Sequence, residues 1–222
     1  MSATEGPVSR AQSREETRHD FRVVSTKDLH VGRVVALRVD DVVMPDGSVA
    51  KREVVEHLGA VAIAAVDDDG AITLIHQYRH PLGGRLWELP AGLLDVDGEV
   101  PLDSARRELM EEAGLTARRW DVLVDTAASP GFTDEVVRVF LARDLAEVPR
   151  ELPADDEEAD LVVHKVPLAQ AVRMALSGEL VNSSTVAGVL AAHTVLTGTG
   201  QARPADAPWP DRPNTFARRK RR

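Results

Sequence analysis

The alternation of apolar and polar residues indicates that the first third of the chain is mostly β-structure. Val-rich runs predict strands over 21–25, 33–44 and 52–58. Between the last two runs, the segment Pro-Asp-Gly-Ser at 45–48 favours a turn, because Pro presets φ and Gly accepts a positive φ. We therefore expect these two runs to form a hairpin that ends before Gly59.

A second β-rich region follows. Residues 60–66 read AVAIAAV, the acidic turn DDDG comes next, and residues 71–79 form another apolar run. We predict a second hairpin from these two runs. Further strands are expected over 120–125, 135–142 and 161–166.

Spacings of three and four residues predict a helix over 101–113, in which Pro101 suits the first turn and Gly114 suits the C-terminal cap. Two more helices are expected near 168–176 and 184–196. Strands and helices alternate without regular βαβ units. This order favours an α+β fold or a layered mixed sheet over a doubly wound fold.

Composition narrows the classes of function. Hydrophobic residues make up 43% and charged residues 28% of the 222 residues, as in soluble globular proteins. The net charge of −9 argues against nucleic acid as a partner, because binding a polyanion requires clustered Lys and Arg. The absence of Cys excludes disulfides and Cys-based zinc sites, so oxygen-liking ions become the favoured metals.

The first 17 residues have no apolar core, and no stretch approaches the 18 apolar residues of a membrane span. We therefore expect a cytoplasmic location and no membrane partner. The chain ends in ARRKRR. We expect a solvated tail there, because short basic ends are usually disordered.

Three carboxylates mark the helix over 101–113. Glu108, Glu111 and Glu112 stand at i, i+3 and i+4, so they project from one flank. Like charges at this spacing repel by a few tenths of a kcal/mol per pair, roughly, in an exposed helix. A multivalent cation would compensate that repulsion. The alternative is a solvated acidic face.

The surrounding pattern resembles the Nudix box. Gly92 is followed by six residues, Glu99, seven residues and then Arg-Glu-Leu-Met-Glu-Glu-Ala-Gly-Leu over 107–115. The second half matches the box at every specified position. The first half has one extra residue between Gly92 and Glu99, which the turn Asp-Val-Asp-Gly before the helix can absorb.

The resemblance implies a Nudix fold, in which a mixed sheet lies between helices as an α/β/α sandwich. It also implies hydrolysis of a diphosphate with Mg²⁺, for which Mn²⁺ can substitute. Glu108 and Glu112 would be the principal metal ligands, Glu111 an auxiliary ligand, and the backbone carbonyl of Ala91 would complete the set. Arg107 would orient a ligand carboxylate, or else form an ordinary surface ion pair.

Residues outside the box resemble the ADP-ribose pyrophosphatase subfamily. Pro130 stands fifteen residues beyond Leu115, and the segment WELPAGLLDV is similar to the corresponding segment of the mycobacterial and actinobacterial enzymes. By this resemblance Glu135 contacts the ribose of the substrate, and Arg79 approaches the diphosphate or terminal ribose. Arg52 would act in a similar way across a dimer interface. Trp87 is either a pocket wall or part of the core.

The resemblance also implies a catalytic base on a loop downstream of the box. The acidic segment 155–160 occupies that place, and Glu158 is the candidate, with Glu157 as the alternative because the register is ambiguous by one residue. An acidic linker is the other interpretation of this segment.

The sequence thus predicts a Mg²⁺-dependent enzyme that hydrolyses ADP-ribose to AMP and ribose 5-phosphate. The alternatives are hydrolysis of another nucleoside diphosphate derivative and a non-catalytic nucleotide-sugar sensor. A small N-terminal antiparallel sheet would join two subunits into a homodimer. The expected parts are a leader (1–19), a dimerising strand domain (20–58), a Nudix catalytic domain (59–200) and a C-terminal tail (201–222).

Overall fold

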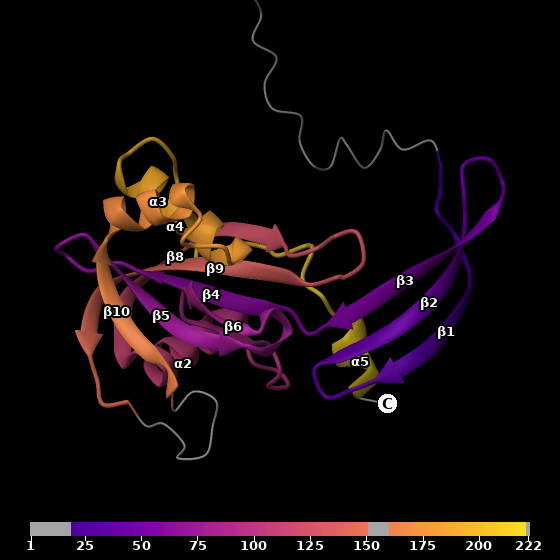
Figure 1. Cartoon of the computed structure of the whole chain (residues 1–222), viewed down its shortest axis with the longest axis horizontal. Helices are drawn as coiled ribbons and strands as arrows, with labels where there is room; N and C mark the ends of the chain where they lie inside the picture. The colour runs from indigo at the N-terminus through magenta and orange to yellow at the C-terminus, as the bar shows by residue number, and fades with distance from the viewer. Residues whose placement is uncertain (1–18, 151–159, 221–222) are drawn as a thin grey trace, which may run out of the picture. The chain divides into compact units, whose positions relative to one another are not determined.

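A computed structural model describes residues 19–150 and 160–220 of the chain. The chain forms two compact units, Met1–Val55 and Glu56–Arg222 (Figure 1). Most of the predicted leader and both candidate bases, Glu157 and Glu158, lie outside the described residues.

The first unit is built on strands β1 (Val23–Val31), β2 (Val35–Val43) and β3 (Val49–His57), in the order β1-β2-β3. The predicted turn between β2 and β3 is confirmed. The Gly47 N–H donates to the Met44 carbonyl (2.9 Å), and Gly47 has a φ of +82°. Strand β1 extends beyond the predicted 21–25. The sequence did not reveal its second half, because all nine residues of the strand are exposed and no apolar alternation marks it.

A mixed five-stranded sheet lies at the centre of the second unit. Strand β4 (Ala60–Ala65) runs parallel to β9 (Val136–Glu147), and the other pairs are antiparallel. The order is β11-β8-β9-β4-β7, with β7 at Ala91–Leu93, β8 at Leu115–Ala127 and β11 at Arg203–Pro204. The predicted mixed sheet is therefore confirmed.

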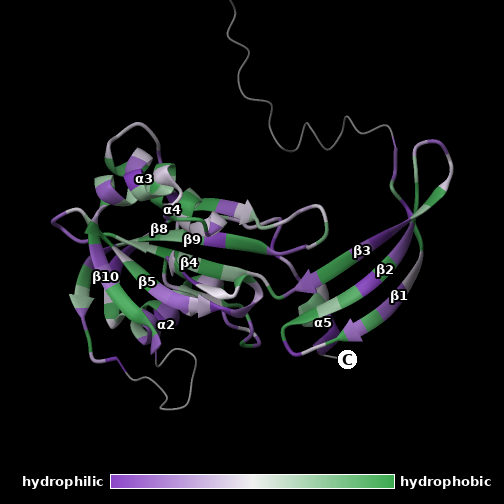
Figure 2. Cartoon of the chain, in the orientation of Figure 1, coloured by the Kyte–Doolittle hydropathy of each residue, from purple (hydrophilic) through white to green (hydrophobic). Residues whose placement is uncertain are grey.

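Strand β4 is buried on both faces, which explains its unbroken apolar run. Val61, Ile63 and Ala65 pack in one core cluster with residues of α2 (Pro101–Ala113). Ala60, Ala62 and Ala64 pack in another cluster with residues of α3 (Leu168–Ser177) and α4 (Ser183–Leu196). The sheet thus lies between helices as an α/β/α sandwich, and its central strands are mostly apolar (Figures 1 and 2).

The predicted second hairpin is wrong. Strand β5 (Ala71–Arg79) belongs to another sheet, in the order β10-β5-β6, with β6 at Gly84–Glu88 and β10 at Val162–Pro167. An isolated antiparallel bridge joins Val66, just after β4, to Ile72 of β5. A continuous apolar run predicts a buried strand but does not specify its partner, and here the chain crosses to a second sheet after a tight turn.

Local signals placed the helices well. Helix α2 begins at Pro101 and ends at Ala113 as predicted, and its cap Gly114 has a φ of +64°. The short elements β6, β7, the 3-10 turn η1 (His80–Leu82) and β11 were not predicted. None of the described helices is both long and apolar enough to cross a bilayer.

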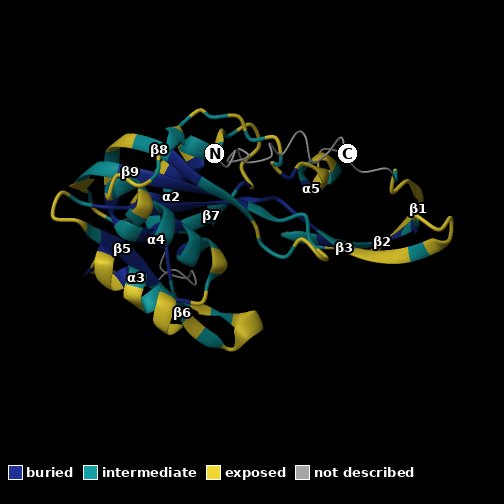
Figure 3. Cartoon of the chain, turned by 90° about the horizontal axis from the view of Figure 1, so that it is seen from above, coloured by how far each residue is buried: buried dark blue, intermediate teal, exposed yellow. Residues whose placement is uncertain are grey.

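The described part of the C-terminal segment differs from the solvated tail that we expected. Strand β11 pairs with β8, and α5 (Thr215–Lys220) buries Phe216 completely. Arg219 Nη2 donates to Glu56 Oε1 at 3.0 Å, and the Glu56 side chain is fully buried. The basic composition concealed these contacts because they depend on one aromatic and one arginine meeting partners far away in the sequence. Figure 3 shows where buried and exposed residues lie in each element.

Candidate active site

The carboxylates of α2 differ in exposure. Glu108 and Glu112 are buried, at 7% and 3% of their full exposure, whereas the side chain of Glu111 retains 36%. All three come from the helix that packs on β4, which fixes their backbone. Burying a carboxylate is costly unless charges or hydrogen bonds compensate it, so the partners of these groups define the site.

Arg107 joins the acidic groups. Its Nη1 lies 2.7 Å from Glu108 Oε1 and 2.9 Å from Glu111 Oε2, and its Nε donates to Glu99 Oε1 at 3.4 Å. Burial acts to lower the pKa of Arg107, but Glu99, Glu108 and Glu111 outweigh it and raise the pKa. The structure therefore brings Arg107 to the carboxylates that it was predicted to orient.

Glu99 ties the loop before α2 to the helix itself. Its Oε2 accepts a hydrogen bond from Ser104 Oγ at 2.5 Å, in addition to the contacts with Arg107. Burial acts to raise the pKa of Glu99, but the hydrogen bonds from Ser104 and Arg107 prevail and lower it. Ser104 is fully buried and was not singled out in the sequence, because a single Ser in a helix carries no motif.

Strand β7 lies against α2 at this point. The Ala91 N–H donates to Glu112 Oε2 at 2.7 Å. Beside it, a Cβ built on Gly92 would overlap the carboxyl group of Glu108. Gly92 is needed because the side chain of Glu108 occupies the space of a Cβ. The first residue of the box and its ligand helix thus meet in space.

Among the residues that the structure describes, no group of three or more His, Asp or Glu side chains is arranged to hold a metal ion. Glu108 is paired with Arg107, and Glu112 accepts from Ala91. The donor set itself fits a hard cation, since carboxylate and carbonyl oxygens are the ligands that Mg²⁺ prefers. The ligand roles of Ala91, Glu108, Glu111 and Glu112 stay predictions.

Arg79 is held in place by a buried carboxylate. Its Nε and Nη2 donate to Glu88 Oε1 (3.0 Å) and Oε2 (2.7 Å), and Gln77 also donates to Glu88. Glu88 is only 2% exposed, whereas the side chain of Arg79 is 43% exposed. A bidentate pair of this kind fixes the guanidinium plane. Sequence reasoning missed Glu88, because its place opposite Ile75 depends on the pairing of β5 with β6, which the sequence did not reveal.

Glu135 lies beside His57, and both residues belong to the second unit. Its Oε1 is 3.8 Å from His57 Nδ1, and the neighbouring Asp134 accepts from the His57 backbone N–H at 2.7 Å. Trp87 stacks on His76, with 4.4 Å between ring centroids, and packs against the core. Of its two predicted roles, this packing favours a place in the core.

Arg52 lies in the first unit. Its guanidinium donates to the Lys51 carbonyl (2.9 Å) and approaches Met44 Sδ (3.2 Å). Its predicted role across a dimer interface is not tested by these contacts, and that of Glu157 or Glu158 falls outside the described residues.

The fold and the helix with its three glutamates agree with the class suggested by the box. The family model of the NUDIX domain matches residues 55–184, which is more than half of the chain. The chain therefore belongs to the Nudix family.

Its relatives are more specific. An ADP-ribose pyrophosphatase of Mycobacterium tuberculosis is 56% identical over 202 residues, which cover 91% of this chain and 97% of the relative. An ADP-ribose pyrophosphatase of Bacillus subtilis is 41% identical over 166 residues, covering 74% and 88%. A crystal structure of an ADP compounds hydrolase has the same fold, with a TM-score of 0.71 at 22% identity, covering 83% of this chain and 98% of that one.

Proposed function

We propose that this protein hydrolyses ADP-ribose to AMP and ribose 5-phosphate with the help of Mg²⁺. The observation that carries the proposal is the α2 site, where Glu108 and Glu112 are buried beside β7 and Arg107. Two relatives that cover most of the chain bear the name ADP-ribose pyrophosphatase, which supports ADP-ribose as the substrate.

The residues of the chain divide the work as follows. Glu108 and Glu112, with Glu111 and the Ala91 carbonyl, would hold the cation, which when bound neutralises diphosphate charge and acidifies a water molecule. Arg107 keeps the carboxylates in place and shields their mutual repulsion before the cation binds.

Substrate contacts come from other elements. Arg79, with its guanidinium plane fixed by Glu88 and its side chain 43% exposed, would present its positive charge to a phosphate or ribose oxygen. We assign a ribose contact to Glu135 and a contact across the dimer to Arg52. Glu158, or Glu157 in the alternative register, would accept the proton of the attacking water.

The test is turnover of ADP-ribose by the full chain at varied Mg²⁺. Glu112→Gln should lose about 100-fold or more in kcat/KM, because it removes a charged ligand of the proposed cation and weakens metal binding. Glu158→Gln should act chiefly on kcat. Asp103→Asn is a matched control on the same helix, where Asp103 forms an exposed pair with Arg106.

A parallel panel of other nucleoside diphosphate derivatives tests substrate choice. Equal or better turnover of a sugar nucleotide or a dinucleoside polyphosphate would overturn the ADP-ribose assignment. Binding of ADP-ribose in saturating Mg²⁺ without release of AMP would instead establish a sensor.

We also propose that the active form is a cytoplasmic homodimer without nucleic acid or membrane partners. The exposed strand β1 supports dimerisation, because Val23, Leu29 and Val31 are each about half exposed on it. Light scattering coupled to gel filtration should give twice the chain mass of 24.1 kDa. A monomer mass at micromolar concentration would contradict the dimer.

A further inference from the structure

The last turn of α2 is completed by a residue from outside the helix. The final carbonyls of a helix lack partners within it. In α2, the Gly114 N–H donates to the Met110 carbonyl (3.0 Å), and Arg150 Nε donates to the Glu111 carbonyl (3.3 Å). Helix α2 has no basic residue in its last turn. Arg150 therefore provides the positive charge that the C-terminal end of a helix favours.

Packing holds Arg150 against this turn. A Cβ built on Gly114 would come within 2.7 Å of Arg150 Cγ, and the Val148 N–H donates to the Gly114 carbonyl at 2.9 Å. Val148 and Arg150 directly follow β9, and β9 pairs with β8, which begins at Leu115 right after the helix. This pairing holds the backbone before Arg150 close to the end of α2.

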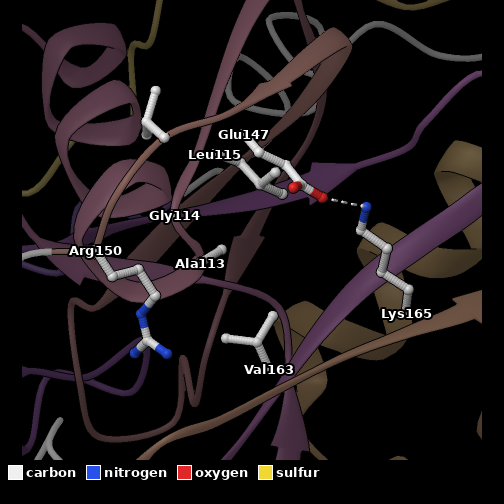
Figure 4. A pocket seen from close by; sticks show the side chains of 8 residues that line it. Ala113, Gly114, Leu115, Glu147, Arg150, Val163 and Lys165 are labelled. Carbon is white, nitrogen blue, oxygen red and sulfur yellow. Dashed lines mark ion pairs between the residues drawn. The ribbon is translucent and has the colours of Figure 1, made fainter.

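Arg150 lines a cavity of about 310 Å³ next to the helix end. Figure 4 shows Arg150 on the side of Ala113, away from the ion pair that Lys165 makes with Glu147 (3.5 Å). Within the described residues, Arg150 Nη2 is buried without a hydrogen-bond partner. A buried unpaired donor opposes folding. This cost offsets part of the stabilisation that Arg150 gives to the end of the helix.

The turn that Arg150 holds carries two of the candidate metal ligands. The carbonyl that it contacts belongs to Glu111, and Glu112 is the next residue. The carboxyl group of Glu112 is tied to β7 by the Ala91 N–H. Glu112 lies one residue before the end of the helix. The position of its backbone therefore depends on whether the last turn stays hydrogen-bonded, because helix ends fray.

We propose that Arg150 is a positioning residue of the cation site, which keeps the last turn of α2 closed and so places Glu111 and Glu112. This inference rests on the proposed function in one respect, namely that the glutamates of α2 bind a divalent cation. In this role Arg150 would act through the backbone of α2, by its hydrogen bond to the Glu111 carbonyl.

The test is Mn²⁺ binding to the full chain without substrate, followed by electron paramagnetic resonance. Arg150→Met keeps the aliphatic stem but removes the charge and the donor. It should weaken Mn²⁺ binding by about 10-fold or more, as expected for groups that orient metal ligands. Lys165→Met is the matched control. It removes a cation from the same cavity, but the partners of Lys165 among the described residues, Glu147 and Asp67, lie outside α2. Mn²⁺ binding should therefore stay at the wild-type value.

Kinetics separate positioning from general damage. Arg150→Met should need more Mg²⁺ for half-maximal turnover, while kcat at saturating Mg²⁺ recovers most of the wild-type value. All measurements are made well below the unfolding midpoint of each variant. If Arg150→Met does not fold, Arg150→Gln takes its place in the same comparison.

Equal Mn²⁺ affinity of the Arg150 variant and the Lys165 control would overturn the inference. This failure differs from failure of the proposed function. If the wild-type chain binds Mn²⁺ in an Arg150-dependent way but does not hydrolyse ADP-ribose, the inference stands and the substrate assignment fails.

Discussion

Gly92 leaves room for the carboxyl group of Glu108, because a Cβ built on its backbone would overlap that side chain. In Gly92→Ala, the flexible Glu108 side chain would move rather than the backbone. We expect kcat/KM to fall by about 100-fold, the cost of a displacement near 1 Å at an active site. The thermal midpoint should change little. Steady-state kinetics and calorimetry on the same sample measure both.

Gly84→Ala is the matched control for this substitution. Gly84 also lies in a strand, and the nearest atom to a Cβ built there is 3.9 Å away. If both variants kept wild-type activity, the close approach of Gly92 to Glu108 would have no role in function.

At the residue scale, the sequence predicted the acidic groups better than their partners. Glu108, Glu111 and Glu112 follow from helical spacing, and the structure brings Arg107 to them. Glu88 could not be found in this way. Its partnership with Arg79 depends on the pairing of β5 with β6, which sequence periodicity does not encode.

At the scale of elements, the junction between the loop and α2 depends on the ionised form of Glu99. Ser104→Ala removes a hydrogen bond to a charged group, which should cost about 1.5–3 kcal/mol of unfolding free energy at neutral pH. The pKa of Glu99 lies below its ordinary value of 4.5 in the folded state. Its stabilisation is therefore present above pH 4.5 and is lost as the pH falls through the lowered folded pKa.

Urea unfolding of wild type and Ser104→Ala at pH 7 and in the acid range checks this sign. The difference between the two proteins should shrink as the pH falls. A difference that grows toward acid would mean that Ser104 stabilises the protonated carboxyl instead.

Signals within or next to an element predict its bounds, but they do not predict its partners in a sheet. Helix α2 was placed correctly because Pro101, the apolar spacing and Gly114 all lie within or next to it. The partner of β4 was predicted wrongly. An apolar run that is buried on both faces does not show which strand lies beside it. Its parallel partner β9 comes about seventy residues later in the sequence, beyond the reach of turn signals.

At the scale of the whole molecule, the C-terminal segment belongs to the folded second unit. Arg219→Met removes the guanidinium that pairs with the fully buried Glu56. We expect a loss of about 3 kcal/mol, the low end for a buried pair, because Arg219 retains 26% of its side-chain exposure. Denaturant unfolding should detect this loss.

Arg218→Met is the matched control, because Arg218 is exposed on the same helix. It should unfold like the wild type. If Arg219→Met also matched the wild type, the ion pair would contribute nothing, and residues 217–222 would behave as the passive tail that the sequence suggested.

The proposed activity depends on α2 as the place where a divalent cation binds a diphosphate. The most direct measurement is a crystal structure with Mg²⁺ and a non-hydrolysable ADP-ribose analogue. We predict a cation bound by Glu108 and Glu112, with the diphosphate of the analogue against it. A structure in which these carboxylates keep their contacts with Arg107 and Ala91 while the analogue binds elsewhere would contradict the account.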